Sequence, residues 1–252
     1  MVVQQPLKNI SIDDAIYSTQ TNCCTGSYYY VAGWRHPVYP TRIYGAQVKI
    51  KTRYGKLCGQ GIEATPTHAC AYVSIEQNYG LGGIWFAQVG YIKMRRDGDT
   101  SYFYGKYFEV DGTDWFRMED SICADLSCAN IPQQGETHSY MIYLDKNTGS
   151  WSAYYDNANF YSYLVYDDIW TIGGNRTQCS GEIYSKESDI PGTQGDPCVF
   201  SEYEVDTLGL FGPDFISAGL EDSTLGTSDT CEWGYKYINS SEFEIWDKKP
   251  LP

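Results

Sequence analysis

The sequence predicts an all-β protein built as a two-sheet antiparallel β-sandwich, and three observations indicate this fold class. Short stretches rich in Tyr, Val, Ile and Phe recur about every ten residues, with Gly, Pro, Asn and Asp between them. No stretch keeps the helical spacing of apolar residues. At least nine stretches have the character of strands, which suits a sandwich of two sheets.

The expected strands, in chain order, are residues 27–34, 45–53, 69–77, 84–94, 101–110, 138–145, 150–156, 180–186 and 241–247. The hairpin over 138–156 is the best supported, because Asn147 and Gly149 between its strands can adopt the positive φ angles of a tight turn. Residues 206–234 have scattered Gly, Ser and Asp without a period, which indicates long loops. Without a linker or an internal repeat, residues 1–252 are expected to form one domain with an irregular segment at about 1–26.

The chain is acidic, with 32 Asp and Glu against 18 Lys and Arg and a net charge of -14. It offers no basic stripe for a phosphate backbone, so nucleic acid is not expected as a partner. No apolar run approaches the roughly 20 residues that cross a bilayer, so no membrane partner is expected either. The acidity serves solubility or fits a working environment at low pH. We expect a monomer.

Nine cysteines are many for a cytosolic chain, and none of them stands in a C-x-x-C pair or a Cys/His cluster with zinc spacing. Disulfides are therefore expected rather than a metal, and most of the cysteines are expected to be paired. The pairs that would close short segments are Cys58/Cys70, Cys123/Cys128 and Cys179/Cys198. Sequence does not fix the connectivity, and one cysteine is left over.

These cysteines indicate a secreted, extracellular protein. Three N-x-S/T sequons, at Asn9, Asn175 and Asn239, would be glycan acceptors in a eukaryotic secretory route. The first residues lack the basic and apolar regions of a signal peptide, so an exported form would already have lost its signal.

The stretch over 84–94 is almost wholly apolar, yet Gln88 lies in its middle. A buried amide without a partner costs about 1 to 3 kcal/mol, so either a neighbouring side chain satisfies it or it faces a groove. Gly90, on the same face of the strand, would let a ligand or another chain approach closely. We expect Gln88 to line the floor of a groove.

Two further strands carry polar side chains that fit such a groove. In 69–77, Tyr72, Ser74 and Glu76 alternate on one face, which is expected to be the wet one. In 180–186, Glu182 follows Gly181, which would clear space beside it. A carboxylate that takes a proton from water and an amide that stabilises an oxyanion can together hydrolyse an amide bond without a metal.

The order and spelling of these segments resemble the glutamic peptidases, a β-sandwich family that includes the fungal eqolisins and the plant neprosin group. "YVSIEQ" resembles the eqolisin strand W-V-G-I-D-G, and "FAQVGY" resembles its L-Q-T-G segment, which carries the catalytic Gln. "CSGEI" resembles the neprosin segment W-G-G-E, which carries the catalytic Glu. "YGAQVKI" and "IYLDKNTGSWSAYYDN" are similar to two further neprosin segments, so the resemblance spans roughly residues 43–186.

This resemblance implies a concanavalin A-like sandwich of the jelly-roll type and a secreted, acid-acting glutamic endopeptidase. It implies Gln88 and Glu182 as the catalytic residues, with the Gln88 amide meeting Glu182 and a water. Tyr72 and Glu76 take the places of the family's groove Trp and Asp and would bind the polypeptide substrate. No cofactor and no metal are implied. Cys179 stands where the family has a Trp, which bears on the substrate contacts.

Other functions remain open. A sandwich with an acidic, Tyr-lined groove also suits a polysaccharide-acting enzyme, either a glycosidase or a lyase, or a carbohydrate-binding module. If Glu76 faces Glu182, the two carboxylates would favour a glycosidase. For Gln88 the plain structural alternative is an amide bonded to a neighbouring strand. A nucleophile triad has little support, since the histidines are scattered and no G-x-S-x-G motif occurs.

Overall fold

The structure is a computed structural model, and it describes residues 30–35, 42–57, 67–78, 84–95, 102–111, 116–123, 126, 128, 130–164, 172–183, 188–209, 214–219, 225–227 and 232–248. The expected irregular segment at about 1–26 lies outside these residues. Among the described residues there is no helix that is both long and apolar enough to cross a membrane.

The described residues form two sheets, and the first has seven strands in the order β14-β1-β10-β3-β4-β5-β6. Their bounds are β1 Tyr30–Arg35, β3 Thr67–Asn78, β4 Ile84–Arg95, β5 Phe103–Asp111, β6 Phe116–Cys123, β10 Arg176–Ile183 and β14 Leu225–Thr227. Each strand in this sheet pairs with its neighbours in the antiparallel sense.

The second sheet has nine strands in the order β15-β16-β11-β12-β2-β7-β8-β9, with β13 beside β12. Their bounds are β2 Gly45–Lys51, β7 Thr137–Asp145, β8 Ser150–Tyr155, β9 Ala158–Leu164, β11 Gly192–Thr193, β12 Asp196–Asp206, β13 Phe215–Ser217, β15 Trp233–Asn239 and β16 Glu242–Asp247. Its pairings are antiparallel except for the single parallel one between β11 and β16.

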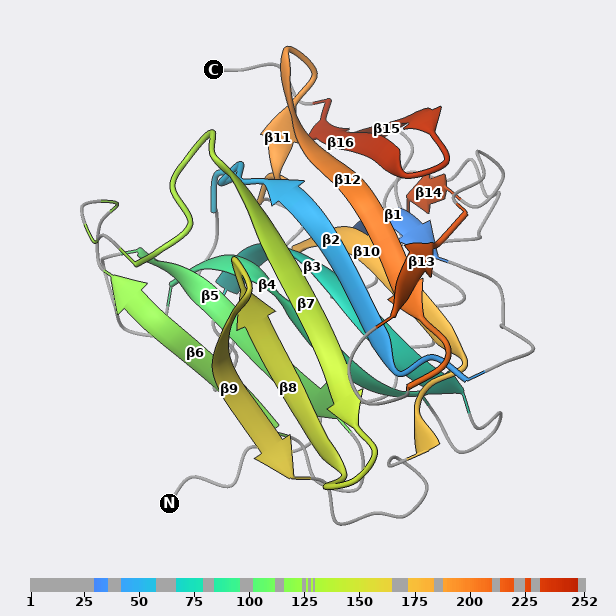
Figure 1. Cartoon of the computed structure of the whole chain (residues 1–252). Coiled ribbons are helices and arrows are strands. Elements are labelled where there is room, and N and C mark those ends of the chain that lie inside the picture. The colour runs from blue at the N-terminus through green and yellow to red at the C-terminus, as the bar shows by residue number, and fades with distance from the viewer. Residues whose placement is uncertain are drawn as a thin grey trace.

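The two sheets lie face to face, with β2, β7 and β8 in front of β3, β4 and β5 (Figure 1). Side chains that alternate along the strands fill the space between the sheets, and Ala71 and Val73 of β3 belong to the same core cluster as Val48 and Ile50 of β2. The largest buried side chains of this core are Trp151, Trp233, Tyr91, Tyr140, Tyr203, Phe108, Phe200 and Phe243. The predicted all-β, concanavalin A-like two-sheet sandwich is confirmed.

All nine predicted strands are present, within a few residues at their ends. The 138–156 hairpin is β7 and β8, and Gly149 in its turn has a φ of 71°. Asn147 does not have a positive φ; its backbone N–H instead donates to the Asp145 carboxylate at 2.9 Å. The expectation of long loops over 206–234 is wrong in part, because β13, β14 and the start of β15 fall there.

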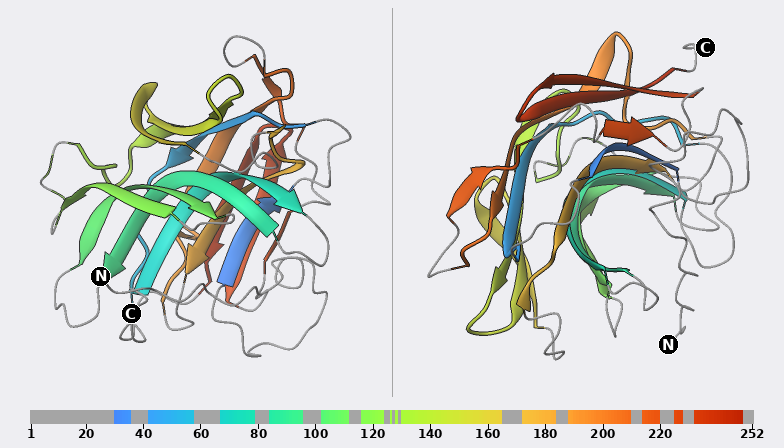
Figure 2. Two further views of the ribbon diagram at one scale, coloured as in Figure 1. Left: turned by 90° about the horizontal axis from the view of Figure 1, so that it is seen from below. Right: turned by 90° about the vertical axis from the view of Figure 1, so that its right-hand side faces the viewer.

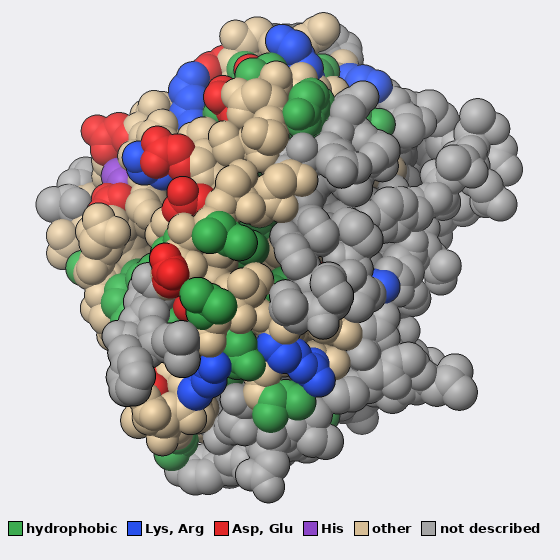
Figure 3. Space-filling model, turned by 45° about the vertical axis from the view of Figure 1, so that its right-hand side comes forward, with side chains coloured by type: hydrophobic (Ala, Val, Ile, Leu, Met, Phe, Trp, Pro, Cys, Tyr) green, Lys and Arg blue, Asp and Glu red, His purple; other side chains and the backbone are tan. Residues whose placement is uncertain are grey.

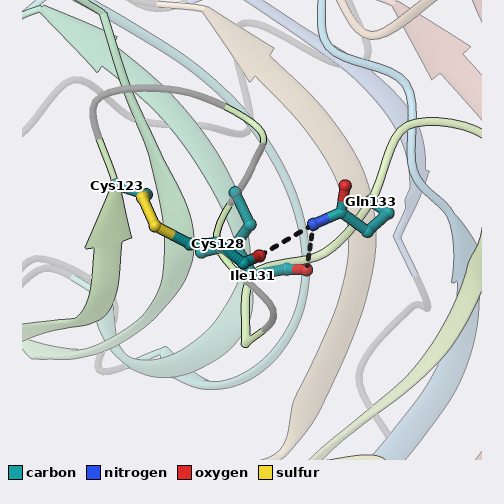
Figure 4. Close-up of a disulfide and its surroundings, with 4 residues drawn as sticks. All are labelled: Cys123, Cys128, Ile131 and Gln133. Carbon is teal, nitrogen blue, oxygen red and sulfur yellow. Dashed lines mark hydrogen bonds between the residues drawn. A yellow bond between two sulfur atoms is a disulfide. The ribbon is translucent and has the colours of Figure 1, made fainter.

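The predicted Cys123–Cys128 disulfide is present and links the end of β6 to the segment before β7 (Figure 4). The Gln133 amide donates to the backbone carbonyls of Cys128 at 3.0 Å and Ile131 at 3.3 Å, which fixes the same segment (Figure 4).

The predicted Cys179/Cys198 bridge is wrong, because both residues are buried thiols in the described structure. Cys70 is also present as a thiol, and its suggested partner Cys58 lies outside the described residues. Of the five described cysteines, two are therefore paired, so the expectation that most are bridged is not met among them. Burial raises the pKa of the Cys198 thiol to about 12, which leaves this thiol inert.

Candidate active site

The candidate functional side chains lie on the face of the seven-stranded sheet that points away from the core. Ala71, Val73 and Ile75 of β3 face the second sheet, so the residues that alternate with them face the other way. Figure 2, in its right-hand view, shows that the seven-stranded sheet is strongly curved and that its concave side faces away from the nine-stranded sheet. We call this side the concave face.

Gln88 lies on the concave face and pairs with Glu109. These residues are opposite each other in the register of β4 and β5, which places their side chains on the same side of the sheet. The Gln88 Nε2 donates to the Glu109 Oε2 at 3.0 Å, and both residues are buried, with 8% of their surface exposed. The amide that looked out of place in an apolar strand therefore has a carboxylate partner.

Two more polar residues complete the same row across the sheet. Ser74 of β3 is the register partner of Gln88, and Gln178 of β10 is the register partner of Ser74. Both are buried, at 1% and 0% exposed. Within the described part of the chain, the Ser74 Oγ and the Gln178 Oε1 have no hydrogen-bond partner. Buried polar atoms nearly always have a partner, so this row has the character of a place for water or for a polar ligand group.

The expectation that the Gln88 amide meets Glu182 is wrong. In β10 it is Gln178 that shares the row of Gln88, and Glu182 is the register partner of Cys70. Four residues along a strand correspond to on the order of 13 Å. Glu182 instead contacts His68, with 3.3 Å between its Oε1 and the His68 Nε2. The two predicted catalytic residues share the concave face without touching.

Tyr72 connects these two parts of the concave face. Its hydroxyl donates to the Glu182 Oε2 at 3.3 Å and accepts from the Gln178 Nε2 at 3.0 Å. The Gln178 Nε2 also donates to the Ser180 Oγ at 2.8 Å. Burial, and then the nearby Glu182 charge, raise the pKa of Tyr72 well above its usual value. The hydroxyl therefore stays protonated and serves as a fixed donor.

The predicted wet face of β3 is not exposed to solvent, since Tyr72, Ser74 and Glu76 are each 1 to 2% exposed. Two glycines also have a different role from the one expected. A Cβ on Gly90 would lie 2.0 Å from the Ala71 carbonyl oxygen, so the glycine admits the neighbouring strand rather than a ligand. A Cβ on Gly181 would meet Ile245 in the core.

Sequence reasoning missed Glu109, although the strand that carries it was predicted. Glu109 could have been found only from the register of the β4–β5 hairpin. The connection between the two strands sets this register and so determines which residue lies opposite Gln88. The sequence leaves that register undefined, since both strands tolerate a shift by two residues without moving an apolar side chain out of the core.

A surface hollow of about 220 Å³ lies on the nine-stranded sheet and is separate from this row. The residues that line it are Gln47, Val48, Lys49, Ser139, Asn157 and Glu202. Lys49 and Glu202 form an ion pair of 2.6 Å there, at well-exposed positions. The charges in this hollow are therefore paired with each other at the surface, and the hollow is a weaker candidate site than the row.

No protein-family model matches the sequence, and a search of curated protein sequences finds no match. Among solved structures, the chain is similar to Scytalido-glutamic peptidase with a peptide-based transition-state analog, at a TM-score of 0.48 and 10% identity, over 86% of this chain and 98% of that one. It is also similar to sheep galectin-11 in complex with glycerol, at a TM-score of 0.31 and 10% identity, over 63% and 96% of the two chains.

A third similar structure is a glycoside hydrolase family 16 endo-glucanase from Bacteroides ovatus, at a TM-score of 0.33 and 10% identity, over 64% of this chain and 70% of that one. All three TM-scores lie below 0.5. The chemistry of the concave face therefore has to be inferred from the residues of this chain.

Proposed function

We propose that this chain is a hydrolase that cleaves peptide bonds with the Gln88–Glu109 pair and a bound water. The observation that carries the proposal is a buried amide–carboxylate contact of 3.0 Å beside two buried polar atoms, the Ser74 Oγ and the Gln178 Oε1, that lack a partner within the described chain. Waters in this row would satisfy those atoms. Glu109 lies two strands from Ser74 and three from Gln178, so we place a further water of the row beside the Glu109 carboxylate, which accepts its proton.

The pair provides the two functions that attack on a peptide carbonyl requires. Glu109 takes a proton from the water as the water oxygen bonds to the carbonyl carbon. Gln88 uses one N–H to hold Glu109 and has a second N–H for the oxyanion that develops on the carbonyl oxygen. As the C–N bond breaks, Glu109 returns the proton to the leaving nitrogen. The products are an acid and an amine, and the carboxylate is regenerated.

Two predicted substrate-binding residues take different places in this proposal. Tyr72 and Glu76 are each 2% exposed, so we assign neither of them a direct substrate contact. The Tyr72 hydroxyl accepts a hydrogen bond from the Gln178 Nε2 and so helps to fix the orientation of that side-chain amide. We place the activity outside the cytosol, which the Cys123–Cys128 disulfide supports.

Glycoside hydrolysis is the second candidate, and one observation favours it. Glu109 and Asp111 are two residues apart on β5 and therefore lie on the same face. Their backbones are about 7 Å apart, so the two carboxyl groups can reach the separations found in glycosidases. The pair of carboxylates first considered, Glu76 and Glu182, is less suitable, because the register separates them by six residues along the strands.

Peptide hydrolysis is tested with denatured casein, and glycan hydrolysis with neutral and acidic polysaccharides, from acidic to neutral pH. Wild-type protein is expected to cleave casein. Glu109→Gln removes the base and should abolish turnover. Gln88→Ala removes an oxyanion donor and should lower kcat by about 10² to 10³. Cleavage of glycans but not of casein would replace the proposal with the second candidate.

The chain contains a matched control for these variants. Gln47 and Glu204 form a second hydrogen-bonded amide–carboxylate pair, between β2 and β12 of the other sheet. Glu204→Gln makes the same chemical change as Glu109→Gln, away from the concave face, and should leave casein cleavage at the wild-type rate. Equal losses in the two variants would show that the effect is structural and would overturn the proposal.

A further inference from the structure

His68, Cys70 and Glu182 form a second cluster on the concave face, away from the Gln88–Glu109 pair. One potential ligand atom of each residue lies within 4.8 Å of those of the other two. His68 and Cys70 are two residues apart on β3 and so point to the same side. Glu182 of β10 is the register partner of Cys70. Two adjacent, paired strands therefore hold all three side chains.

One distance inside the cluster is the distance expected between two ligands of one metal ion. The His68 Nε2 and the Glu182 Oε1 are 3.3 Å apart, whereas a charge-assisted hydrogen bond is normally about 2.7 to 2.9 Å. Two ligands of a tetrahedral zinc ion, each about 2.0 to 2.1 Å from it, are about 3.3 Å apart. The distance is longer than a typical charge-assisted hydrogen bond and equals the separation expected between two ligands of one metal.

The surroundings of the cluster also favour a bound cation. The His68 and Glu182 side chains are only 5% and 14% exposed. Cys70 packs in a small hydrophobic cluster of its own, with Tyr72, Ile92, Met94, Tyr107 and Phe103. A carboxylate in such a place is costly unless a positive charge compensates it. Zn²⁺ with one thiolate and one carboxylate is a neutral unit, which suits an apolar site.

Two tyrosine hydroxyls donate hydrogen bonds to side chains of this cluster. The Tyr72 hydroxyl donates to the Glu182 Oε2, and the Tyr107 hydroxyl donates to the Cys70 Sγ at 3.5 Å. Partners of this kind orient metal ligands and are a regular feature of metal sites.

We propose that His68, Cys70 and Glu182 bind one Zn²⁺ ion. Imidazole, thiolate and carboxylate are all established zinc ligands, and the thiolate disfavours Mg²⁺ and Ca²⁺. This site goes beyond the hydrolase function, since none of its residues belongs to the Gln88–Glu109 row. His68 and Cys70 are close together in the sequence, but Glu182 is more than a hundred residues from Cys70 along the chain, so the sequence alone does not show that the three side chains meet.

The test uses tag-free, full-length protein equilibrated with ZnSO₄, separated from excess metal by gel filtration and analysed for zinc by mass spectrometry. Wild type is expected to retain about one zinc per chain. Replacing zinc with Co²⁺ should produce a thiolate-to-cobalt charge-transfer band in the near ultraviolet. Cys70→Ser should remove this band, and Glu182→Gln should lower the zinc affinity by at least about tenfold. Cys198→Ser, a buried thiol on the other sheet, is the matched control and should keep both signals.

The wild-type measurement alone can overturn the proposal, so it does not depend on the folding of any variant. Folded wild-type protein that retains no zinc and shows no cobalt–thiolate band does not have this site. A disulfide between Cys58 and Cys70 in the purified protein would also contradict it. The outcome is separate from the hydrolase proposal, because Glu109→Gln is expected to be inactive and still bind zinc.

Discussion

At the scale of single residues, Gln88 shows how a polar side chain is accommodated in an apolar strand. Leaving its amide unpaired would cost about 1 to 3 kcal/mol, and Glu109 on the next strand removes that cost with a hydrogen bond of 3.0 Å. The partner is itself a buried carboxylate, which is costly to bury and gains from the same contact. The contact thus lowers the cost of burying both side chains.

The sequence predicted which residues lie on the concave face better than it predicted which of them are in contact. The sequence placed Gln88, Tyr72, Glu76 and Glu182 on strands, and alternation placed each of the four on one face of its strand. The pairing of Gln88 with Glu182 failed because contact depends on register. Side-chain alternation has a period of two and so cannot distinguish one register from another shifted by two residues.

At the scale of elements, the β3–β4 pairing depends on a glycine. A Cβ on Gly90 would lie 2.0 Å from the Ala71 carbonyl oxygen and 2.8 Å from the Tyr72 Cα. Both are backbone atoms, so neither can relieve the clash by a change of side-chain rotamer. The close approach of these two strands therefore requires a residue without a side chain.

Gly90→Ala is expected to destabilise the protein by about 1 to 3 kcal/mol, because the added methyl must push two central strands apart. Urea unfolding followed by tryptophan fluorescence measures this as a lower midpoint. Gly195→Ala is the control, since nothing lies within 4 Å of a Cβ built there, and its change should stay within about 0.5 kcal/mol. Equal midpoints for the two variants would mean that the strands do not approach this closely.

Three of the strands that the sequence analysis did not predict, β12, β13 and β14, have patterns too weak or too short to recognise. β12 (Asp196–Asp206) starts with Asp-Pro and contains three further acidic residues, so its alternation is weak even though Phe200, Tyr203 and Val205 are buried. β13 and β14 have three residues each, too few for a periodic pattern to show. Tertiary pairing, rather than local preference, makes these segments strands.

At the scale of the whole molecule, the pattern of strands in the sequence predicted the fold class correctly. The number of cysteines, by contrast, led to the wrong prediction of a Cys179–Cys198 disulfide in the core. Cys179 and Cys198 are buried thiols that pack as small apolar side chains. The net charge is -14. Figure 3 shows acidic and basic side chains interspersed on the described part of that view, without a region of one sign.

Buried tyrosines make the stability of the whole fold sensitive to alkali. Burial raises the pKa of Tyr72, Tyr91, Tyr107 and Tyr140 well above the usual value. The folded state therefore keeps these hydroxyls protonated where the unfolded chain releases their protons, at a pH of about 10. Their contribution to stability is complete below that pH and is lost as the pH rises above it.

The free energy of unfolding is expected to fall with rising pH above about 10, by up to about 1.4 kcal/mol per pH unit for each such tyrosine. Urea titrations at neutral and alkaline pH measure the fall. Tyrosinate absorbance from these residues should appear together with unfolding and not before it. A stability that stays constant through this alkaline range would show that the four hydroxyls are not buried as described.

The central claim is that Glu109, and not Glu182, is the carboxylate that acts with Gln88. Its most direct test compares casein hydrolysis by Glu109→Gln and Glu182→Gln, each shown by circular dichroism to be folded at the assay temperature. The 3.0 Å contact of Gln88 with Glu109, and the separation of Glu182 by four residues of register, predict that turnover is abolished in the first variant and persists in the second. Persistent turnover in Glu109→Gln together with its loss in Glu182→Gln would contradict the claim.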